Sequence, residues 1–126
     1  MSSAVKHKGR CHCGTVQFEV TAPSDLKALR CNCSICSMTG FLHLIVEAQA
    51  FNLLKGADAL NTYRFNTGAA KHLFCSHCGV KSFYVPRSHP GGYSVNVNCL
   101  VPETITSLHI DDFDGENWED ALGSIT

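Results

Sequence analysis

Short runs in which apolar and polar residues alternate occur along most of the chain. Residues 15–20 alternate in this way, which is typical of a half-buried β-strand, and Pro23 lies just beyond them. Residues 26–33 are a candidate for the returning strand. In the segment 41–46 apolar residues occupy both the odd and the even positions, so we predict a strand that is covered on both faces. The first half of the chain therefore reads as β structure.

The second half continues this pattern, with turn signals at Lys55-Gly56, at Thr67-Gly68 and from Pro86 to Gly92. Helical hints are confined to a turn after Cys33 and to residues 117–122. We therefore predict an all-β fold in a single domain over residues 1–126. The further predicted strands are 51–54, 60–65, 72–74, 82–85 and 93–98.

Composition agrees with a globular domain, because 44% of the residues are hydrophobic and 17% are charged. No apolar run approaches the roughly 20 residues that cross a bilayer, and the N-terminus lacks the apolar stretch of a signal peptide. We therefore expect a cytoplasmic protein with no membrane partner.

Charge is distributed unevenly along the chain. All 10 Lys and Arg residues lie at or before Arg87, whereas residues 88–126 carry acids and no base. Metal-bound thiolates would lower the positive charge of the first part further, so no nucleic-acid partner is expected. The acidic stretch 111–120 is expected to be a solvated terminal segment in which Trp118 docks as an apolar anchor.

Cysteine is the unusual residue, with 8 in 126 positions, and 7 of these lie in three tight groups. Cysteines one or two residues apart rarely meet disulfide geometry, and clustered thiols in a reducing compartment are most often metal ligands. We therefore favour zinc over disulfides or a redox thiol pair. The groups are Cys11-x-Cys13, Cys31-x-Cys33-x-x-Cys36 and Cys75-x-x-Cys78.

The first and last groups together supply four thiolates, which is the closed shell of a structural zinc site. We call Cys11, Cys13, Cys75 and Cys78 the four-cysteine cluster. A glycine follows each half, Gly14 and Gly79. The position after the second ligand often needs a positive φ, which glycine adopts without penalty.

The middle group, Cys31, Cys33 and Cys36, offers three thiolates and no obvious fourth; we call it the three-cysteine cluster. Three protein ligands with an open position are typical of a catalytic zinc site. The alternative is a second structural site completed by Cys99 or by a histidine. Cys99 falls on the same side of the predicted strand 93–98 as Tyr93, Val95 and Val97. This position favours a small buried apolar side chain over a metal ligand.

Two further residues are candidates for binding. His43 interrupts an apolar run, so we expect either a hydrogen-bonded core histidine or a contact with the substrate or the outer shell of the metal. Arg87 lies in a loop rich in proline and glycine and could bind a carboxylate, although a solvated arginine is the simpler reading. His12 and His77 are expected to point away from the metal, and the remaining histidines read as ordinary surface residues.

The ordered cysteine motifs resemble those of the glutathione-dependent formaldehyde-activating enzyme family, over about residues 6 to 122. Several other segments resemble the centromere protein V branch of that family: Phe51-x-Leu53-Leu54-Lys55-Gly56, Thr62-Tyr63-x-Phe65-Asn66-Thr67, Ser82-Phe83-Tyr84-x-Pro86-Arg87-Ser88-x-Pro90-Gly91-Gly92 and Phe113-x-Gly115-x-x-Trp118-Glu119. The long basic extension of centromere members is not matched, so their chromatin role is not carried over.

The resemblance implies a β-tent of small antiparallel sheets organised around two zinc ions. It implies a structural zinc at the four-cysteine cluster and a catalytic zinc at the three-cysteine cluster. The implied activity is that of a carbon–sulfur lyase that joins formaldehyde to glutathione as S-hydroxymethylglutathione. Because glutathione brings two carboxylates, we expect a cation beside the three-cysteine cluster, with Arg87 as the first candidate and His43 as the second.

Two functions from different classes stay open at this point. The favoured one is a zinc-dependent carbon–sulfur lyase or synthase acting on a small thiol such as glutathione. The alternative is a non-catalytic, zinc-stabilised binding module, and a thiol-based sensor is a weaker third. The sequence does not fix the physiological thiol, the aldehyde or the oligomeric state.

Overall fold

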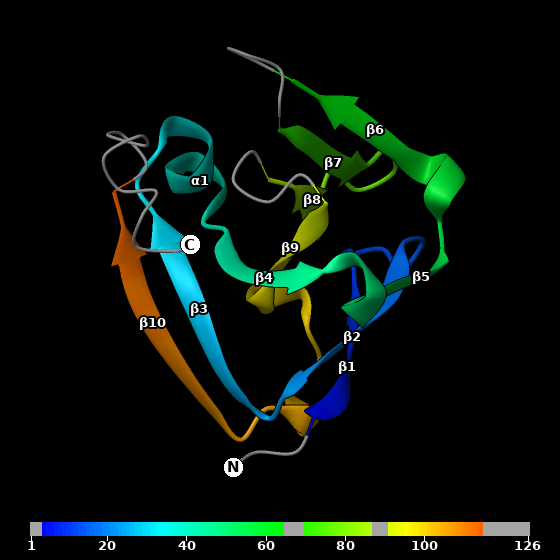
Figure 1. Cartoon of the computed structure of the whole chain (residues 1–126). Helices are drawn as coiled ribbons and strands as arrows, with labels where there is room; N and C mark the ends of the chain where they lie inside the picture. The colour runs from blue at the N-terminus through cyan, green and yellow to red at the C-terminus, as the bar shows by residue number, and fades with distance from the viewer. Residues whose placement is uncertain (1–3, 65–69, 87–90, 115–126) are drawn as a thin grey trace.

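A computed structural model describes residues 4–64, 70–86 and 91–114 (Figure 1). The described part is built mainly from strands, with one short α-helix, α1 (Ser34–Thr39). Four single 3₁₀ turns, η1 to η4, lie at Ala48–Ala50, Ala57–Ala59, Val97–Cys99 and Pro102–Thr104. The strands are β1 (Ala4–Arg10), β2 (Gln17–Pro23), β3 (Asp25–Cys31), β4 (Leu42–Glu47), β5 (Phe51–Lys55), β6 (Leu60–Tyr63), β7 (Lys71–Cys75), β8 (Phe83–Val85), β9 (Gly92–Asn96) and β10 (Ser107–Phe113).

These strands form two sheets. The smaller sheet has 3 strands in the order β1-β2-β5, and the larger has 7 in the order β10-β3-β4-β9-β8-β7-β6. Neighbours are antiparallel except for β10 and β3, which run parallel along the edge visible at the left of Figure 1. The all-β prediction of small sheets is thus confirmed, with one parallel pair added.

Aromatic side chains join the two sheets in a shared core. Phe18 on β2 stacks on Phe51 of β5 at 5.4 Å between ring centroids, and its edge meets Phe83 of β8 at 5.5 Å. Phe51 also stacks on Tyr93 of β9 at 4.3 Å. Phe18 is completely buried. Because these rings come from both sheets, their packing fixes how the sheets meet.

Most predicted strands are present, with changes at their ends. The segment 41–46 becomes β4, an interior strand between β3 and β9, where the successive residues His43 and Leu44 face opposite sides and are both buried. The helical turn after Cys33 is α1. The run 93–98 stops at Asn96, because Asn96 Oδ1 accepts from the backbone N–H of Asn98 and starts a 3₁₀ turn.

One predicted pairing is wrong. Residues 25–31 do form a strand, but β3 does not return along β2. Instead β2 pairs with β1 and β5, whereas β3 enters the larger sheet between β10 and β4. Pro23 and Ser24 therefore form a corner between sheets rather than a hairpin.

The acidic segment also differs from expectation. Residues 107–113 form β10, which pairs with β3 in parallel, and Asp112 makes an ion pair with Arg30 at 2.9 Å. The segment is thus an edge strand at least as far as Phe113, whose ring is buried. Trp118 and the predicted helix at 117–122 lie outside the described residues. Within the described ranges, no helix is long and apolar enough to cross a membrane.

Candidate metal centres

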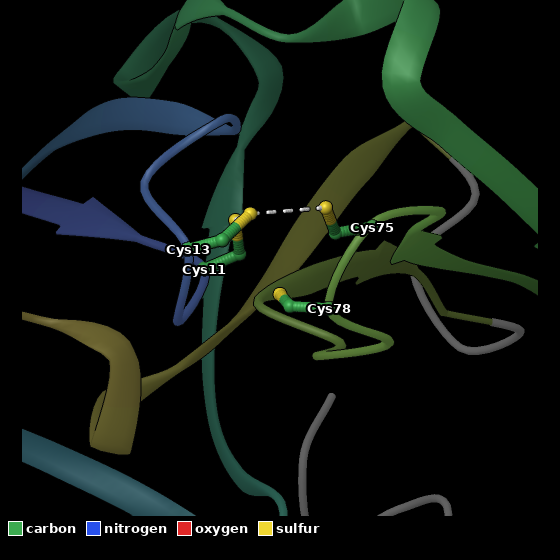
Figure 2. Close-up of side chains that lie close together, drawn as sticks. All are labelled: Cys11, Cys13, Cys75 and Cys78. Atoms are coloured by element: carbon green, nitrogen blue, oxygen red, sulfur yellow. Dashed lines mark hydrogen bonds between the residues drawn. The ribbon is translucent and has the colours of Figure 1, made fainter.

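The four-cysteine cluster forms where two loops distant in sequence face each other (Figure 2). Cys11 and Cys13 lie in the loop after β1, Cys75 ends β7 and Cys78 lies in the turn that follows. The four Sγ atoms are all within 4.8 Å of one another. Cys13 Sγ lies 3.7 Å from both Cys11 Sγ and Cys75 Sγ.

This spacing fits a tetrahedral metal. Zn–S bonds of about 2.3 Å place neighbouring sulfurs of a tetrahedron about 3.8 Å apart, close to the observed 3.7 Å and far beyond the roughly 2.05 Å of a disulfide. All eight cysteines are free. The donor set therefore fits a closed four-thiolate site.

Backbone geometry supports the same conclusion. Gly14 and Gly79 have φ values of 80° and 76°, as expected for the residue after each ligand pair. The backbone N–H of Val16 donates to Cys11 Sγ at 3.3 Å, and that of His77 donates to Cys75 Sγ at 3.4 Å. Such donors stabilise thiolates, so the loops are shaped to hold charged sulfur.

The thiols of this cluster have different affinities for a proton. The hydrogen bond with Thr15 lowers the pKa of Cys13 to about 6, whereas burial raises the pKa of Cys11 to about 11. The flanking His12 and His77 are exposed and do not belong to the cluster. This agrees with the prediction that they point away from the metal.

The three-cysteine cluster lies where β3 passes into α1. Cys31 ends β3, Cys33 immediately precedes α1, and Cys36 is buried within that helix. Their Sγ atoms are also within 4.8 Å of one another. No fourth His, Cys, Asp or Glu of the described residues joins this group.

Proton sharing within this cluster strongly favours one thiolate. Hydrogen bonds from Cys31 and Cys36 lower the pKa of Cys33 to about 2, whereas hydrogen bonds with Cys31 and then with Cys33 raise the pKa of Cys36. In this arrangement the Cys33 thiolate accepts hydrogen bonds from the thiols of Cys31 and Cys36. A metal that bound all three sulfurs would displace the two remaining protons. These three donors fit a metal site that keeps one position open.

Cys99 belongs to neither cluster. It is half-buried in η3, and burial raises the pKa of its thiol to about 11, with a further contribution from the charges of Cys11 and Cys78. Its electrostatic neighbours are thus in the four-cysteine cluster, so Cys99 does not complete the three-cysteine cluster.

His43 lies directly behind the three-cysteine cluster. Its Nε2 is 3.1 Å from Cys36 Sγ, while its Nδ1 is 2.9 Å from Ser94 Oγ and 3.2 Å from Tyr84 Oη. Because two hydroxyl groups can donate to Nδ1, the proton of a neutral ring belongs on Nε2, where it donates to the sulfur. Burial and then the charge of Lys81 lower the pKa of His43 to about 4, so the ring is neutral. Its geometry is that of an outer-shell group.

Two histidines expected at the surface are buried, so that prediction is wrong. His7 on β1 is enclosed, with Nδ1 2.7 Å from Thr104 Oγ1 and Nε2 2.9 Å from the Pro23 carbonyl. His72 on β7 is buried against the ring of Tyr84 at 4.8 Å. Hydrogen-bond partners make both burials tolerable: Thr104 and Pro23 for His7, and Lys81 for His72. None of these partners adjoins its histidine in the sequence, so they leave no local pattern.

Lys81 is the residue near the site that sequence reasoning missed. It is 8% exposed, and its Nζ lies 2.7 Å from His72 Nδ1. It follows Cys78, the end of the last cysteine group, by three residues, and lysine is ordinarily a surface residue. Only the fold shows that it lies in the interior.

A pocket of about 550 Å³ opens beside the three-cysteine cluster. Cys31 and Cys36 line it together with Phe41, and the polar side chains of Arg30 and Asp112 stand on its β3 and β10 wall. Two of the three candidate ligands are thus reachable from a space large enough for a small molecule. Arg87, the predicted carboxylate contact, lies outside the described residues.

This chain is similar to known proteins in sequence and in fold. The model of the glutathione-dependent formaldehyde-activating enzyme family matches residues 6–111. A protein of Halomonas elongata, provisionally named as a glutathione-dependent formaldehyde-activating enzyme, is 34% identical over 79 residues. That match covers 56% of this chain and 50% of the relative, so the chain spans about half of that protein's length.

A solved structure agrees. The crystal structure of a Rhodobacter sphaeroides protein, a structural genomics target, superposes with a TM-score of 0.70 at 35% sequence identity. The superposition covers 82% of this chain and 99% of that one. From the family match over most of its length, the chain belongs to the glutathione-dependent formaldehyde-activating enzyme family.

Proposed function

We propose that this chain is a zinc-dependent carbon–sulfur lyase or synthase that interconverts glutathione plus formaldehyde with S-hydroxymethylglutathione. The observation that carries the proposal is the three-cysteine cluster: three thiols converge, no fourth donor among the described residues joins them, and two of them line a pocket. The family match and the name of the Halomonas relative supply the thiol and the aldehyde.

Zinc bound by Cys31, Cys33 and Cys36 would hold the substrate sulfur as a thiolate at neutral pH. In the synthase direction the glutathione thiol would lose its proton, its sulfur would bond to the formaldehyde carbon as the C=O π pair moves to oxygen, and that oxygen would take up one proton, so the protons balance. In the lyase direction the hydroxyl would lose its proton, the C=O bond would re-form, and the S–C bond would break with its electron pair going to sulfur. With three thiolate ligands the metal would be a weak Lewis acid, so delivery of the nucleophile is the favoured role.

The chain's own residues orient this chemistry. His43 donates to Cys36 Sγ and is itself fixed by Ser94 and Tyr84, which holds the ligand in one position. The Phe41 ring packs on His43 at 4.6 Å and lines the pocket, so it limits water next to the sulfurs. Arg30 is the cation that the described pocket wall offers to a substrate carboxylate.

Exchange spectroscopy tests the proposal, because uncatalysed addition of thiols to formaldehyde is already fast. The rate at which S-hydroxymethylglutathione exchanges with free glutathione can be measured at equilibrium by two-dimensional NMR. We expect the wild-type protein to raise this rate and the Cys33→Ser variant to leave it at the buffer value. A wild-type rate equal to that of buffer would refute catalysis and favour the binding-module alternative.

The second zinc ion is proposed for the four-cysteine cluster, in a structural role. We also propose that the chain belongs to the centromere protein V branch of its family, on the motifs quoted above. That assignment concerns ancestry and adds no chromatin function.

A further inference from the structure

Lys81 is a buried cation that has no carboxylate partner among the described residues. It follows the turn that carries Cys78, and its side chain is 8% exposed. Within the described part of the chain, no Asp or Glu lies within ion-pair distance of its ammonium group. Burying an ammonium group without a counter-charge is costly, so the fold must compensate this one in another way.

Neutral groups solvate part of the charge. Lys81 Nζ donates to His72 Nδ1 at 2.7 Å, and it lies over the rings of Tyr84 and Phe41 at 4.0 and 4.9 Å from their centroids. Aromatic faces attract a cation through their quadrupole. Neither these rings nor a neutral imidazole carries a full negative charge, however.

The negative charges that act on Lys81 come from sulfurs. Burial lowers the pKa of Lys81 to about 8, and the charges that act in the opposite direction are those of Cys36, Cys33 and Cys31. The same ring of Tyr84 that Lys81 contacts carries the hydroxyl that meets His43 Nδ1, and His43 Nε2 meets Cys36 Sγ. Tyr84 and His43 therefore connect Lys81 to Cys36. Phe41, the other ring under the ammonium group, lines the same pocket as Cys31 and Cys36.

The positive charge of Lys81 affects which ligands bind at the open position of the three-cysteine cluster. Three thiolates and one Zn²⁺ carry a net charge of minus one, and a fourth ligand that binds as a thiolate adds another negative charge. In a buried site this accumulation opposes binding, and a fixed cation close by reduces the opposition. A neutral fourth ligand adds no charge and gains little from the cation.

We propose that Lys81 is the counter-charge of the three-cysteine cluster and makes its open position selective for an anionic sulfur ligand over a neutral one. Lys81 is thereby a positioning residue, since it acts through the ligand set and does not touch the substrate. The inference rests on the proposed metal at Cys31, Cys33 and Cys36, and it names a ligand preference that the family match does not contain.

Cobalt-loaded protein tests this directly, because bound thiolates give an intense sulfur-to-cobalt absorption band. Wild type and Lys81→Met are each titrated with 2-mercaptoethanol, whose thiolate brings no other charge, and with imidazole as a neutral ligand. The matched control is Lys8→Met, which removes an exposed lysine on β1 in the smaller sheet. The four-cysteine cluster has no open position and adds only a constant background.

We expect Lys81→Met to weaken 2-mercaptoethanol binding by about tenfold or more, the effect of about one pKa unit of lost charge interaction. Imidazole affinity should stay within about twofold, the Lys8→Met variant should match wild type, and Lys81→Arg should recover part of the thiol affinity.

Three results would contradict either the role of Lys81 or the open position of the three-cysteine cluster. Equal thiol affinity in wild type and Lys81→Met overturns the role of Lys81. Parallel loss of thiol and imidazole binding also overturns it, because Lys81 would then only support the fold. A wild-type protein that binds neither ligand refutes the open position itself, and with it the proposed function.

Discussion

Cys75 and Cys33 hold matching places in their motifs but very different places in the fold. Cys75 is fully buried at the end of β7, within the core cluster that includes Phe18 and Phe83. Cys33 is half-buried just before α1, next to the pocket. Loss of a ligand should therefore destabilise the fold at the first position and empty a local site at the second.

We predict that Cys75→Ser lowers solubility and thermal stability severely, because a structural zinc contributes folding free energy directly. Cys33→Ser should lose about one zinc ion per chain and remain folded. Metal analysis and thermal melting of both variants check this. A Cys75→Ser protein with an unchanged melting midpoint and two zinc ions would contradict the structural assignment.

His72 should make stability depend on pH. Burial, followed by the charge of Lys81, lowers its pKa to about 4, whereas an unfolded histidine titrates near pH 6.5. Between these values the unfolded chain binds the extra proton, so the contribution is complete above pH 6.5 and is lost as the pH falls toward 4. A difference of about 2.5 pKa units makes this loss roughly 3 kcal/mol by the time the pH has fallen below 4.

Urea unfolding at pH 7 and pH 4.5 measures this effect. The free energy of unfolding should drop less on acidification in His72→Gln than in wild type, because glutamine does not titrate. Metal loss at acid pH affects both proteins, so the difference between them isolates His72. Identical drops would contradict the assignment.

Aromatic side chains at the interface of the two sheets hold the sheets together. Phe18 on β2 contacts Phe51 in its own sheet and Phe83 in the other. Gly9 on β1 lies against the same ring, and a Cβ built at Gly9 would come within 2.3 Å of it. The aromatic cluster is therefore tightly fitted.

We predict that Phe18→Ala destabilises the domain by about 3 to 5 kcal/mol, the usual range for truncating a buried phenylalanine. Leu54→Ala is the control, since Leu54 on β5 is 50% exposed and should change stability by less than about 1 kcal/mol. Chemical denaturation measures both. A Phe18→Ala loss as small as that of Leu54→Ala would show that the cluster does not join the sheets.

The β3–β10 pair builds the pocket wall, and Arg30 is its described cation. Its exposed ion pair with Asp112 contributes little to stability. We predict that Arg30→Ala weakens glutathione binding by about 1 to 3 kcal/mol and leaves 2-mercaptoethanol binding unchanged, as measured by calorimetry. Arg87→Ala, the change suggested by the sequence, is the comparison, and equal glutathione affinity in both variants and wild type would exclude an arginine clamp.

Sequence patterns predicted strands best where the buried side chains are apolar. The strand β4 could be predicted because residues 41–46 are apolar on both parities. The strand β1 could not, because its buried residues are His7 and Gly9 rather than aliphatic side chains. On β10 six of seven residues are exposed, so its acids read as solvated chain although the backbone pairs with β3.

At the scale of the whole molecule, cysteine spacing anticipated both clusters because each loop motif fixes its own thiols locally. The interruption of the apolar run 41–46 singled out His43, but its partners behind the three-cysteine cluster could not be predicted. Tyr84, Ser94 and Lys81 come from two strands and a loop, and only the larger sheet brings them together. Long-range hydrogen bonds of this kind have no periodic signature.

X-ray absorption at the zinc edge, in thiol-free buffer and then with glutathione, tests the open position of the three-cysteine cluster most directly. One closed and one open site predict an average of about 3.5 sulfurs per zinc, rising to about four when glutathione binds. Four sulfurs per zinc before any thiol is added would show that the three-cysteine cluster is a closed site, and would contradict its proposed open position.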